Sequence, residues 1–412
     1  MNLSIADYED IVGTPVIEHL RQLGEKLKGV RVIHVNSTME GGGVAEILKW
    51  MVPLMEDLGL EAHWKVITGT HDFFRITKSI HNGLQGYPTE LSRKDWHTYE
   101  DVNAGNLDTL KNDLEAADIV VIHDPQPAPL MQMCSNRRGK WIWRVHIDIS
   151  QPFRPIWKTL RPFVDKYDAS IFSMAQFAQF LPHPQYLVAP SIDPLSEKNM
   201  DLDRSEIEKV REDFQLDADR PILVQISRFD RFKDPIGVIK AYHLVRHVIP
   251  VQLVLAGGGA TDDPEGAAFL EEVMEAAQGE KDIHVLDLPP DAHRTINALQ
   301  RMADIVIQKS TKEGFGLTVT EGLWKGKPVI GGDVGGIKLQ LANHYTGFLV
   351  NTPEGAAHRI RFLLHHREKM KEMGTTAKEF VRENFLLTRH LQDYLILMLC
   401  LLRNTRENTL IV

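Results

Sequence analysis

The sequence predicts an α/β protein with two doubly wound domains, each built on a parallel sheet. Short apolar runs rich in β-branched residues alternate with longer amphipathic stretches, which is typical of parallel strands joined by helices. The alternation restarts after about residue 191, and a length of 412 residues suits two domains of ordinary size. In each half a strand is followed by three glycines and a helix, at residues 41–43 and 257–259.

The first half carries a set of short predicted strands. Residues 30–36 read VRVIHVN and residues 118–124 read DIVVIHD, so both runs are apolar almost throughout. Strands of this kind are expected to be covered by helices on both faces of a parallel sheet. The other predicted strands of this half are residues 62–67, 141–147 and 170–173.

The second half repeats the pattern after a predicted linker at residues 189–200, which contains two prolines and shows no apolar periodicity. We therefore expect domains at residues 1–195 and 196–385. The apolar helical stretch at 386–412 closes the second domain or packs back on the first, and periodicity favours neither. The predicted strands of this half are residues 221–227, 251–256, 283–288, 304–308 and 328–331.

Composition excludes several classes of protein. The 47 basic and 56 acidic residues give a formal net charge of −9, which argues against nucleic-acid binding through a general basic surface. The two cysteines, Cys134 and Cys400, are too few for a disulfide framework and suit a reducing compartment. The longest apolar run, residues 394–402, is far shorter than the about 20 residues of a membrane span. The acidic N-terminus is no signal peptide, and we expect a soluble cytoplasmic protein.

The first glycine motif is Gly41–Gly43, between a strand and a helix that begins near Val44. Glycine allows backbone N–H groups to approach an anion, and a helix presents its positive end at its start. The motif departs from the dinucleotide fingerprint because Glu46 stands where a third glycine is expected. NAD binding is therefore weakly supported, and phosphate contact and a plain tight turn both remain open.

A basic loop, residues 227–233, directly follows a buried strand. Asp234 and Pro235 have the sequence of a helix N-cap with proline at the first helical position. This places Arg228 and Lys233 on a short loop at the carboxyl end of the strand, where two cations could neutralise a diphosphate. The alternative is a solvated charged loop.

The string EGFGLTVTE, residues 313–321, follows another strand and opens a helix near Gly316. Its carboxylates, Glu313 on the loop and Glu321 about one and a half turns into the helix, can accept hydrogen bonds from sugar hydroxyls. The N–H groups of residues 314–317 can hold phosphate. The alternative is that Glu313 complements the helix dipole and Glu321 is an ordinary surface residue.

Three polar residues end strands of the first half: Asp124, His146 and Asp148. A single histidine at such a position is either a core residue with its hydrogen bonds satisfied or part of a binding site, and ligands of open α/β sheets bind at strand carboxyl ends. The sequence contains no HExxH, no paired CxxC and no Gly-x-Ser-x-Gly. We therefore predict no metal site and no hydrolase nucleophile.

Together the motifs resemble those of retaining glycosyltransferases of the GT-B type, the large group that includes glycogen and sucrose-phosphate synthases, and within that group they resemble glycosyltransferase family 4. Longer strings such as VNSTMEGGGVAEIL and FFRITKSIHNGLQG are more narrowly similar to trehalose synthases of the glycosyltransferring type. The similarity covers nearly the whole chain, with a departure in the glycine-rich loop AGGGATDDPEG. It implies an acceptor domain followed by a nucleotide-sugar donor domain, facing each other across a cleft.

The resemblance implies a role for each motif residue. Arg228 and Lys233 would grip the diphosphate, Glu313 would bind hydroxyls of the donor glucose, and His146 would contact that sugar near the reacting centre. Glu321 would bind the ribose. The remaining donor residues would be Gly42, Gly43, Gly314, Phe315, Gly316 and Leu317. The candidates for acceptor binding are Asn36, His81, Asn82, Gln85 and Asp124.

The implied reaction moves glucose, with retention and reversibly, from ADP-, UDP- or GDP-glucose to free glucose to form trehalose. No cofactor is expected to be required, although Mg²⁺ could accompany the nucleotide. Alternatives on the same fold are a retaining trehalose phosphorylase, another α-glycosyl transfer, a sugar-nucleotide 2-epimerase and a catalytically silent sensor. The expected partners are the sugar substrates, with no nucleic acid and no membrane, and the sequence leaves open whether the chain forms a homodimer.

Overall fold

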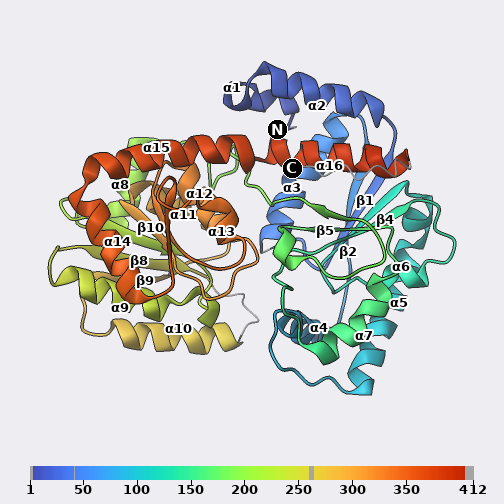
Figure 1. Ribbon diagram of the computed structural model, residues 1–412, viewed down its shortest axis with the longest axis horizontal. Helices are drawn as coiled ribbons and strands as arrows, with labels where there is room; N and C mark the ends of the chain where they lie inside the picture. Colours follow the sequence, from blue (N-terminus) through green and yellow to red (C-terminus); the bar gives the residue numbers. More distant parts are fainter. Residues whose placement is uncertain (1–2, 41, 259–263, 404–412) are drawn as a thin grey trace. The chain divides into compact units, whose positions relative to one another are not determined.

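A computed structural model of the protein describes residues 3–40, 42–258 and 264–403. The chain forms two compact units (Figure 1). Unit 1 comprises the described residues of Met1–Pro190 and Leu387–Val412, and unit 2 comprises those of Ser191–Leu386. Each unit contains a six-stranded sheet in which every pair of neighbouring strands is parallel. Gly41 and Gly259, from the two glycine motifs, lie outside the described residues, as do residues 260–263 of the departing loop.

The sheet of unit 1 has the strand order β2-β1-β3-β4-β5-β6. The five predicted strands are confirmed within three residues at each end, and β6 is an additional edge strand. Its three residues are only half-buried, so it lacks the apolar run by which the others are recognised. The strands are β1 (Arg31–Asn36), β2 (Glu61–Val66), β3 (Ile119–His123), β4 (Lys140–Arg144), β5 (Ala169–Phe172) and β6 (Gln185–Leu187).

Helices cover both faces of this sheet. Apolar side chains of α4 (His71–Leu84), α5 (Arg93–Ala116) and α7 (Arg154–Val164) pack with Trp141 and Trp143 of β4 in one continuous core. The opposite group of helices includes α2 (Thr14–Lys26), α3 (Gly43–Asp57) and α16 (Leu387–Leu402), which pack on one another. Shorter helical segments are η1 (Ile5–Tyr8), α1 (Glu9–Val12), α6 (Leu130–Met133) and η2 (Ala175–Phe177).

The C-terminal helix α16 is therefore part of unit 1, where it contacts α2 and α3 (Figure 1). Its apolar side chains, among them Leu391, Leu395 and Met398, are buried. The apolar run at residues 394–402, which is too short to span a bilayer, thus supplies the buried face of α16. Within the described part of the chain, no helix combines the length and the apolar composition needed to cross a membrane.

The sheet of unit 2 has the order β12-β11-β10-β7-β8-β9. Again the five predicted strands are found, and the short edge strand β12 is additional. The strands are β7 (Ile222–Ile226), β8 (Gln252–Gly257), β9 (Ile283–Asp287), β10 (Ile305–Gln308), β11 (Val329–Gly332) and β12 (Gly347–Val350). The helical segments are α8 (Arg204–Asp213), η3 (Arg231–Lys233), α9 (Pro235–Arg246), α10 (Pro264–Ala277), α11 (His293–Met302), α12 (Leu317–Trp324), α13 (Ile337–Gln340), α14 (Pro353–His365) and α15 (Arg367–Asn384).

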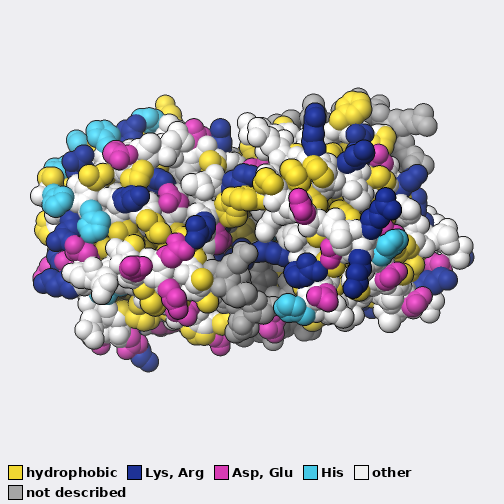
Figure 2. Space-filling view, turned by 90° about the horizontal axis from the view of Figure 1, so that it is seen from below, with side chains coloured by type: hydrophobic (Ala, Val, Ile, Leu, Met, Phe, Trp, Pro, Cys, Tyr) yellow, Lys and Arg dark blue, Asp and Glu magenta, His cyan; other side chains and the backbone are white. Residues whose placement is uncertain are grey.

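The predicted linker differs from its sequence expectation. The boundary between the units lies after Pro190, five residues before the expected one, and Ser191–Leu386 form one compact body. Ile192 is buried and forms an isolated bridge with Leu386. Pro194 thus belongs to the compact body of unit 2, whereas Pro190 is the last residue before the boundary and belongs to unit 1. On the face drawn in Figure 2, basic and acidic side chains are interspersed.

Candidate functional site

The order of the strands picks out one place in each unit. In unit 1 the chain crosses from one side of β1 to the other, so the sheet reverses direction of growth between β1 and β3. In unit 2 the same reversal lies between β7 and β10. Ligands of open α/β sheets bind outside the strand carboxyl ends at such a switch point. The residues that follow these four strands are therefore the candidates for function.

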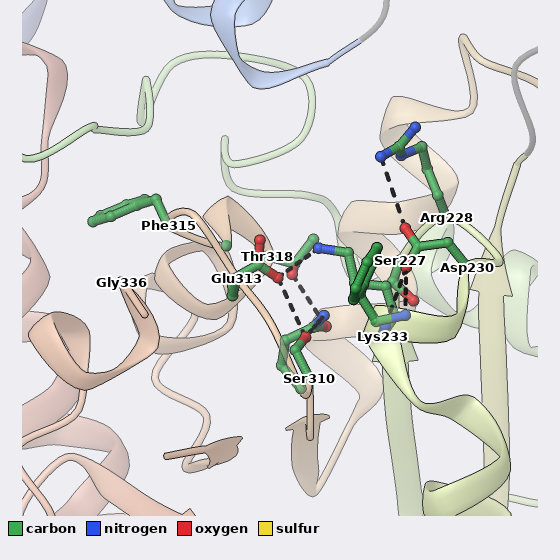
Figure 3. A network of polar contacts seen from close by, with 12 residues as sticks. Ser227, Arg228, Asp230, Lys233, Ser310, Glu313, Phe315, Thr318 and Gly336 are labelled. Carbon is green, nitrogen blue, oxygen red and sulfur yellow. Dashed lines mark hydrogen bonds and ion pairs between the residues drawn. The ribbon is translucent and has the colours of Figure 1, made fainter. Parts of the chain in front are cut away.

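In unit 2 the switch point holds an ion pair between Lys233, after β7, and Glu313, after β10. Lys233 Nζ lies 2.5 Å from Glu313 Oε2, and the side chains are only 18% and 9% exposed. Ser310 Oγ donates to the same carboxylate oxygen at 3.3 Å (Figure 3). Two predicted site residues that are 80 positions apart thus meet at one point.

The turn that carries Lys233 is held by its neighbours. The Asp230 carboxylate accepts hydrogen bonds from the N–H groups of Phe232 and Lys233. Asp234 adopts a left-handed conformation with φ of 48° and caps α9 by accepting from Gly237 N, as its sequence predicts. Lys309, which directly follows β10, forms an ion pair with Asp234. These contacts fix the Lys233 backbone before any ligand is bound.

Sequence reasoning missed Lys309 and Ser310. Both directly follow β10, so their place at a strand carboxyl end was a usable signal. Their partners, however, are Asp234 and Glu313, and the first of these lies 75 residues away in the sequence. The Lys309–Asp234 contact forms because β7 and β10 are neighbours in the sheet, and this pairing cannot be predicted from the sequence pattern.

The loop before α12 is held in a glycine-lined turn. Gly316, the N-cap of α12, has φ of 84°, and no side chain caps the helix there. A Cβ on Gly335 would lie 1.7 Å from the carbonyl oxygen of Glu313, and one on Gly336 would lie 2.5 Å from that of Gly314. The two backbone segments therefore touch, and the start of α12 presents its N–H groups in the geometry that suits an anion.

Glu321 is buried, so its interpretation as an ordinary surface residue is wrong. Its Oε2 accepts a hydrogen bond from Gln300 Nε2 at 3.1 Å. Lys325 Nζ lies close by, donating to the Glu321 backbone oxygen at 3.4 Å and to Asn199 Oδ1 at 3.1 Å. Burial lowers the pKa of Lys325 to about 7, against the opposing charge of Glu321.

Arg228 is the predicted residue that the structure does not bring to the Lys233–Glu313 pair. Its side chain is 59% exposed and its guanidinium lies 3.7 Å from the Asp230 carboxylate. Figure 3 shows it directed away from Glu313. Of the two cations predicted on this loop, only Lys233 contacts the Glu313 carboxylate.

In unit 1 the switch point opens into a cavity of about 160 Å³. The cavity brings the glycine motif together with three of the five acceptor candidates, whereas Asn82 and Gln85 of α4 are not among its lining residues. His146 is not among them either, although its partner His123 is. The lining residues are Asn36, Ser37, Thr38, Gly42, Gly43, Val44, His81, His123, Asp124 and Gln126.

Asp124 follows β3 with φ of 62°, a left-handed conformation that aspartate tolerates better than most residues. Its N–H donates to the Arg144 carbonyl, and its Oδ1 accepts from the N–H of His146 at 2.8 Å. Desolvation raises the pKa of the Asp124 carboxyl to about 6, opposed by that hydrogen bond and by the Arg144 charge. The group therefore changes charge close to neutral pH.

Three histidines form a chain beneath the cavity. His34 Nδ1 lies 3.0 Å from His123 Nε2, and His123 Nδ1 lies 2.9 Å from His146 Nε2. Burial lowers the pKa of each imidazole, to about 3 for His34. Sequence reasoning proposed only His146. The signal for the others was that both VRVIHVN and DIVVIHD carry a histidine near the strand end.

A buried cation, Arg144, lies on β4, the strand that precedes His146. Arg144 of β4 is fully buried, and none of its guanidinium nitrogens has a hydrogen-bond partner among the described residues. Burial lowers its pKa, while Tyr394 and Asp393 of α16 and Asp124 oppose that shift. In the described ranges, no group of three His, Cys, Asp or Glu side chains is placed to hold a metal ion.

Comparison with known proteins gives two family matches. The family described as "Trehalose synthase, N-terminal domain" matches residues 34–179, and "Glycosyl transferases group 1" matches residues 206–380. A trehalose synthase from Thermococcus litoralis is 47% identical over 399 residues, covering 96% of each chain. A trehalose phosphorylase from Pleurotus pulmonarius is 27% identical over 409 residues, covering 86% of this chain and 54% of the phosphorylase.

Solved structures agree on the fold. The structure described as trehalose-6-phosphate from E. coli bound with UDP-2-fluoro glucose matches with a TM-score of 0.74 at 13% identity. The match covers 89% of this chain and 98% of that one. At this identity the likeness concerns architecture only. With the group 1 family match and the two parallel sheets, it confirms the predicted α/β GT-B class.

Proposed function

The chain belongs to the trehalose synthase family of glycosyltransferases, and on that premise we propose that it transfers glucose from a nucleotide-glucose to free glucose, forming trehalose. The observation that carries the proposal is the Lys233–Glu313 pair at the switch point of unit 2, beside the uncapped start of α12. A cation and free N–H groups suit a diphosphate, and a carboxylate suits sugar hydroxyls.

The proposed reaction begins with cleavage of the bond between C1 of the donor glucose and the diphosphate oxygen. Negative charge grows on the departing phosphate, where Lys233 and the first N–H groups of α12 stabilise it. The acceptor hydroxyl forms its bond to C1 on the same face, and its proton passes to the departing phosphate. The products are trehalose and the nucleoside diphosphate, with retained configuration and no enzyme nucleophile.

The cavity of unit 1 is the proposed acceptor site. Its volume of about 160 Å³ favours a single small molecule, since pockets for drug-sized ligands begin near about 300 Å³. Asn36, His81 and Asp124 supply both donors and acceptors of hydrogen bonds, which polyhydroxylated sugars require. We propose that these three residues bind the acceptor glucose.

Several finer assignments belong to the same proposal. Gly42 and Gly43 border the diphosphate, Glu321 binds the ribose, and Arg228 turns toward the donor when it is bound. No cofactor is required, and a cytoplasmic location suits the two cysteines. Asn82 and Gln85 remain weaker acceptor candidates.

A donor panel tests the function. The protein is incubated with UDP-, ADP- or GDP-glucose and free glucose, and the product is identified by chromatography and by the anomeric NMR signals of its linkage. We expect an α,α-linked disaccharide from at least one donor. Absence of disaccharide with every donor would reject the proposal.

Two further arms of that experiment separate the alternatives. Donor alone should remain unchanged, because conversion without acceptor would indicate an epimerase. Glucose 1-phosphate with glucose should give no trehalose, because a product there would indicate a phosphorylase. The trehalose phosphorylase relative makes this arm informative, although the present chain spans only 54% of its length.

The activity should depend on the ionisation of Asp124. Because the pKa of this carboxyl is raised to about 6, it is ionised and can accept from a sugar hydroxyl above that pH, and is neutral below it. We expect kcat/KM for glucose to be flat above about pH 7 and to fall by about tenfold per pH unit below about pH 6.

Asp124→Asn should remove the fall of kcat/KM at acid pH and leave a low, pH-independent rate. Asp148→Asn is the matched control, since Asp148 lies four residues from β4 and accepts from Ser150 N outside the cavity. Its profile should equal that of the wild type. An unchanged acid limb in Asp124→Asn would show that another group titrates.

A further inference from the structure

The histidine chain next to the cavity links a fully buried ring, His34, to a ring that is only partly buried, His146. His34 on β1 is fully buried and does not line the cavity, whereas its neighbour His123 does. His146, the third ring, is only partly buried. Its Nε2 is engaged by His123, and none of the hydrogen bonds described for the chain involves its Nδ1. The histidine chain therefore ends at Nδ1 of a partly buried ring.

The direction of the hydrogen bonds along the three histidines, that is, which ring donates to which, follows from the surroundings of the buried ring His34. Neutral imidazole has one N–H and one lone pair, so each ring that donates at one nitrogen must accept at the other. His34 Nε2 is buried and has no partner among the described residues. If the chain ran from His146 to His34, this atom would be an N–H without an acceptor, which is costly and rare in a protein interior.

The opposite polarity avoids that cost. His34 Nδ1–H then donates to His123 Nε2, and His123 Nδ1–H donates to His146 Nε2. His146 is left with its proton on Nδ1, the ring nitrogen that His123 does not engage. The buried surroundings keep all three rings neutral, and Arg144 on β4 and His390 on α16 add to this effect at His146.

We propose that His34 and His123 are positioning residues that hold His146 in its Nδ1–H tautomer, so that this ring donates a hydrogen bond to a hydroxyl of the transferred glucose. The inference rests on the proposed function for the identity of the ligand. It adds two residues to the site and a direction to the contact: His146 is a donor and not a base.

The tautomer can be observed directly. The full-length protein is labelled with ¹⁵N-histidine, and two-bond ¹H–¹⁵N spectra are recorded without ligand, with His146 assigned by the loss of its signals in His146→Ala. We expect the pattern of a neutral ring protonated at Nδ1. A ring protonated at Nε2, or a charged ring at pH 7, overturns the proposal, and this measurement needs no variant of the chain interior.

A pair of variants at His34 tests whether the chain sets the tautomer. His34→Asn keeps an amide N–H where Nδ1 stands, and His34→Leu removes it. We expect His34→Asn to remain within about twofold of wild-type kcat/KM, and His34→Leu to lose about tenfold, the worth of one hydrogen bond, with a shift of His146 toward mixed tautomers.

The outcomes separate this inference from the proposed function. If no disaccharide forms but His146 is protonated at Nδ1 and changes in His34→Leu, the positioning role stands and the reaction is wrong. If both variants lose activity equally, in step with their melting temperatures, the chain only packs the interior and the positioning role is overturned. If His34→Leu does not fold, the wild-type spectrum decides.

Discussion

Lys233→Ala is expected to lower the rate of glucosyl transfer by on the order of a hundredfold or more. Lys233 is held on a fixed turn with its ammonium group against Glu313, in a place where only 18% of its side chain is exposed. A preorganised cation in such a place stabilises the charge that grows on the leaving phosphate, and no water-exposed group can replace it. The loss should fall mainly on kcat.

The neighbouring residue Arg231 provides a matched control. It lies on the same turn, η3, and also forms an ion pair, but with Glu272 and with 76% of its side chain exposed. Arg231→Ala removes an equal charge from the loop and should leave the rate within about twofold, as exposed pairs contribute little. Equal losses in the two variants, or a near-wild-type rate in Lys233→Ala, would show that the site is misplaced.

Glu313→Gln should lower transfer by a similar factor. The substitution keeps the shape of the side chain but removes the charge that Lys233 Nζ and Ser310 Oγ contact. The amide accepts sugar hydroxyls less strongly than a carboxylate does, and the ammonium group loses its anchor. Glu272→Gln is the exposed control and should be close to wild type.

The double variant makes the prediction sharper. If Lys233 and Glu313 act as one unit, Lys233→Ala combined with Glu313→Gln should cost little more than either change alone. Initial rates measured for the four proteins of this cycle give the coupling. Full additivity would mean that the two residues serve separate steps, which contradicts a shared site.

Much of the architecture could be predicted from local pattern. Apolar runs such as VRVIHVN and PILVQIS mark buried strands because a parallel sheet hides both faces of each strand. The edge strands β6 and β12 were not predicted, and the three residues of β6 are only half-buried, so that strand carries no buried apolar run. Short edge strands owe their conformation to hydrogen bonding with a neighbour, and that neighbour is not visible in the sequence.

The candidate site was predictable where chemistry follows a strand directly. Lys233, Glu313 and Asp124 were found because strand carboxyl ends bear ligands in this class of fold. The buried partners were not found: Lys309 depends on Asp234, and His34 depends on His123, 89 residues away. Those pairs exist because non-consecutive strands lie side by side.

By itself, the sequence determined the class of the fold, the family and the order of the motifs, because strand burial, helix capping and strand-end motifs are encoded in a few consecutive residues. Only the tertiary structure decided that Arg228 turns away while Lys233 meets Glu313, that Glu321 is interior, and that α16 covers unit 1. Each of these depends on which surfaces remain to be buried once the sheets have formed, and burial is a property of the whole packed unit.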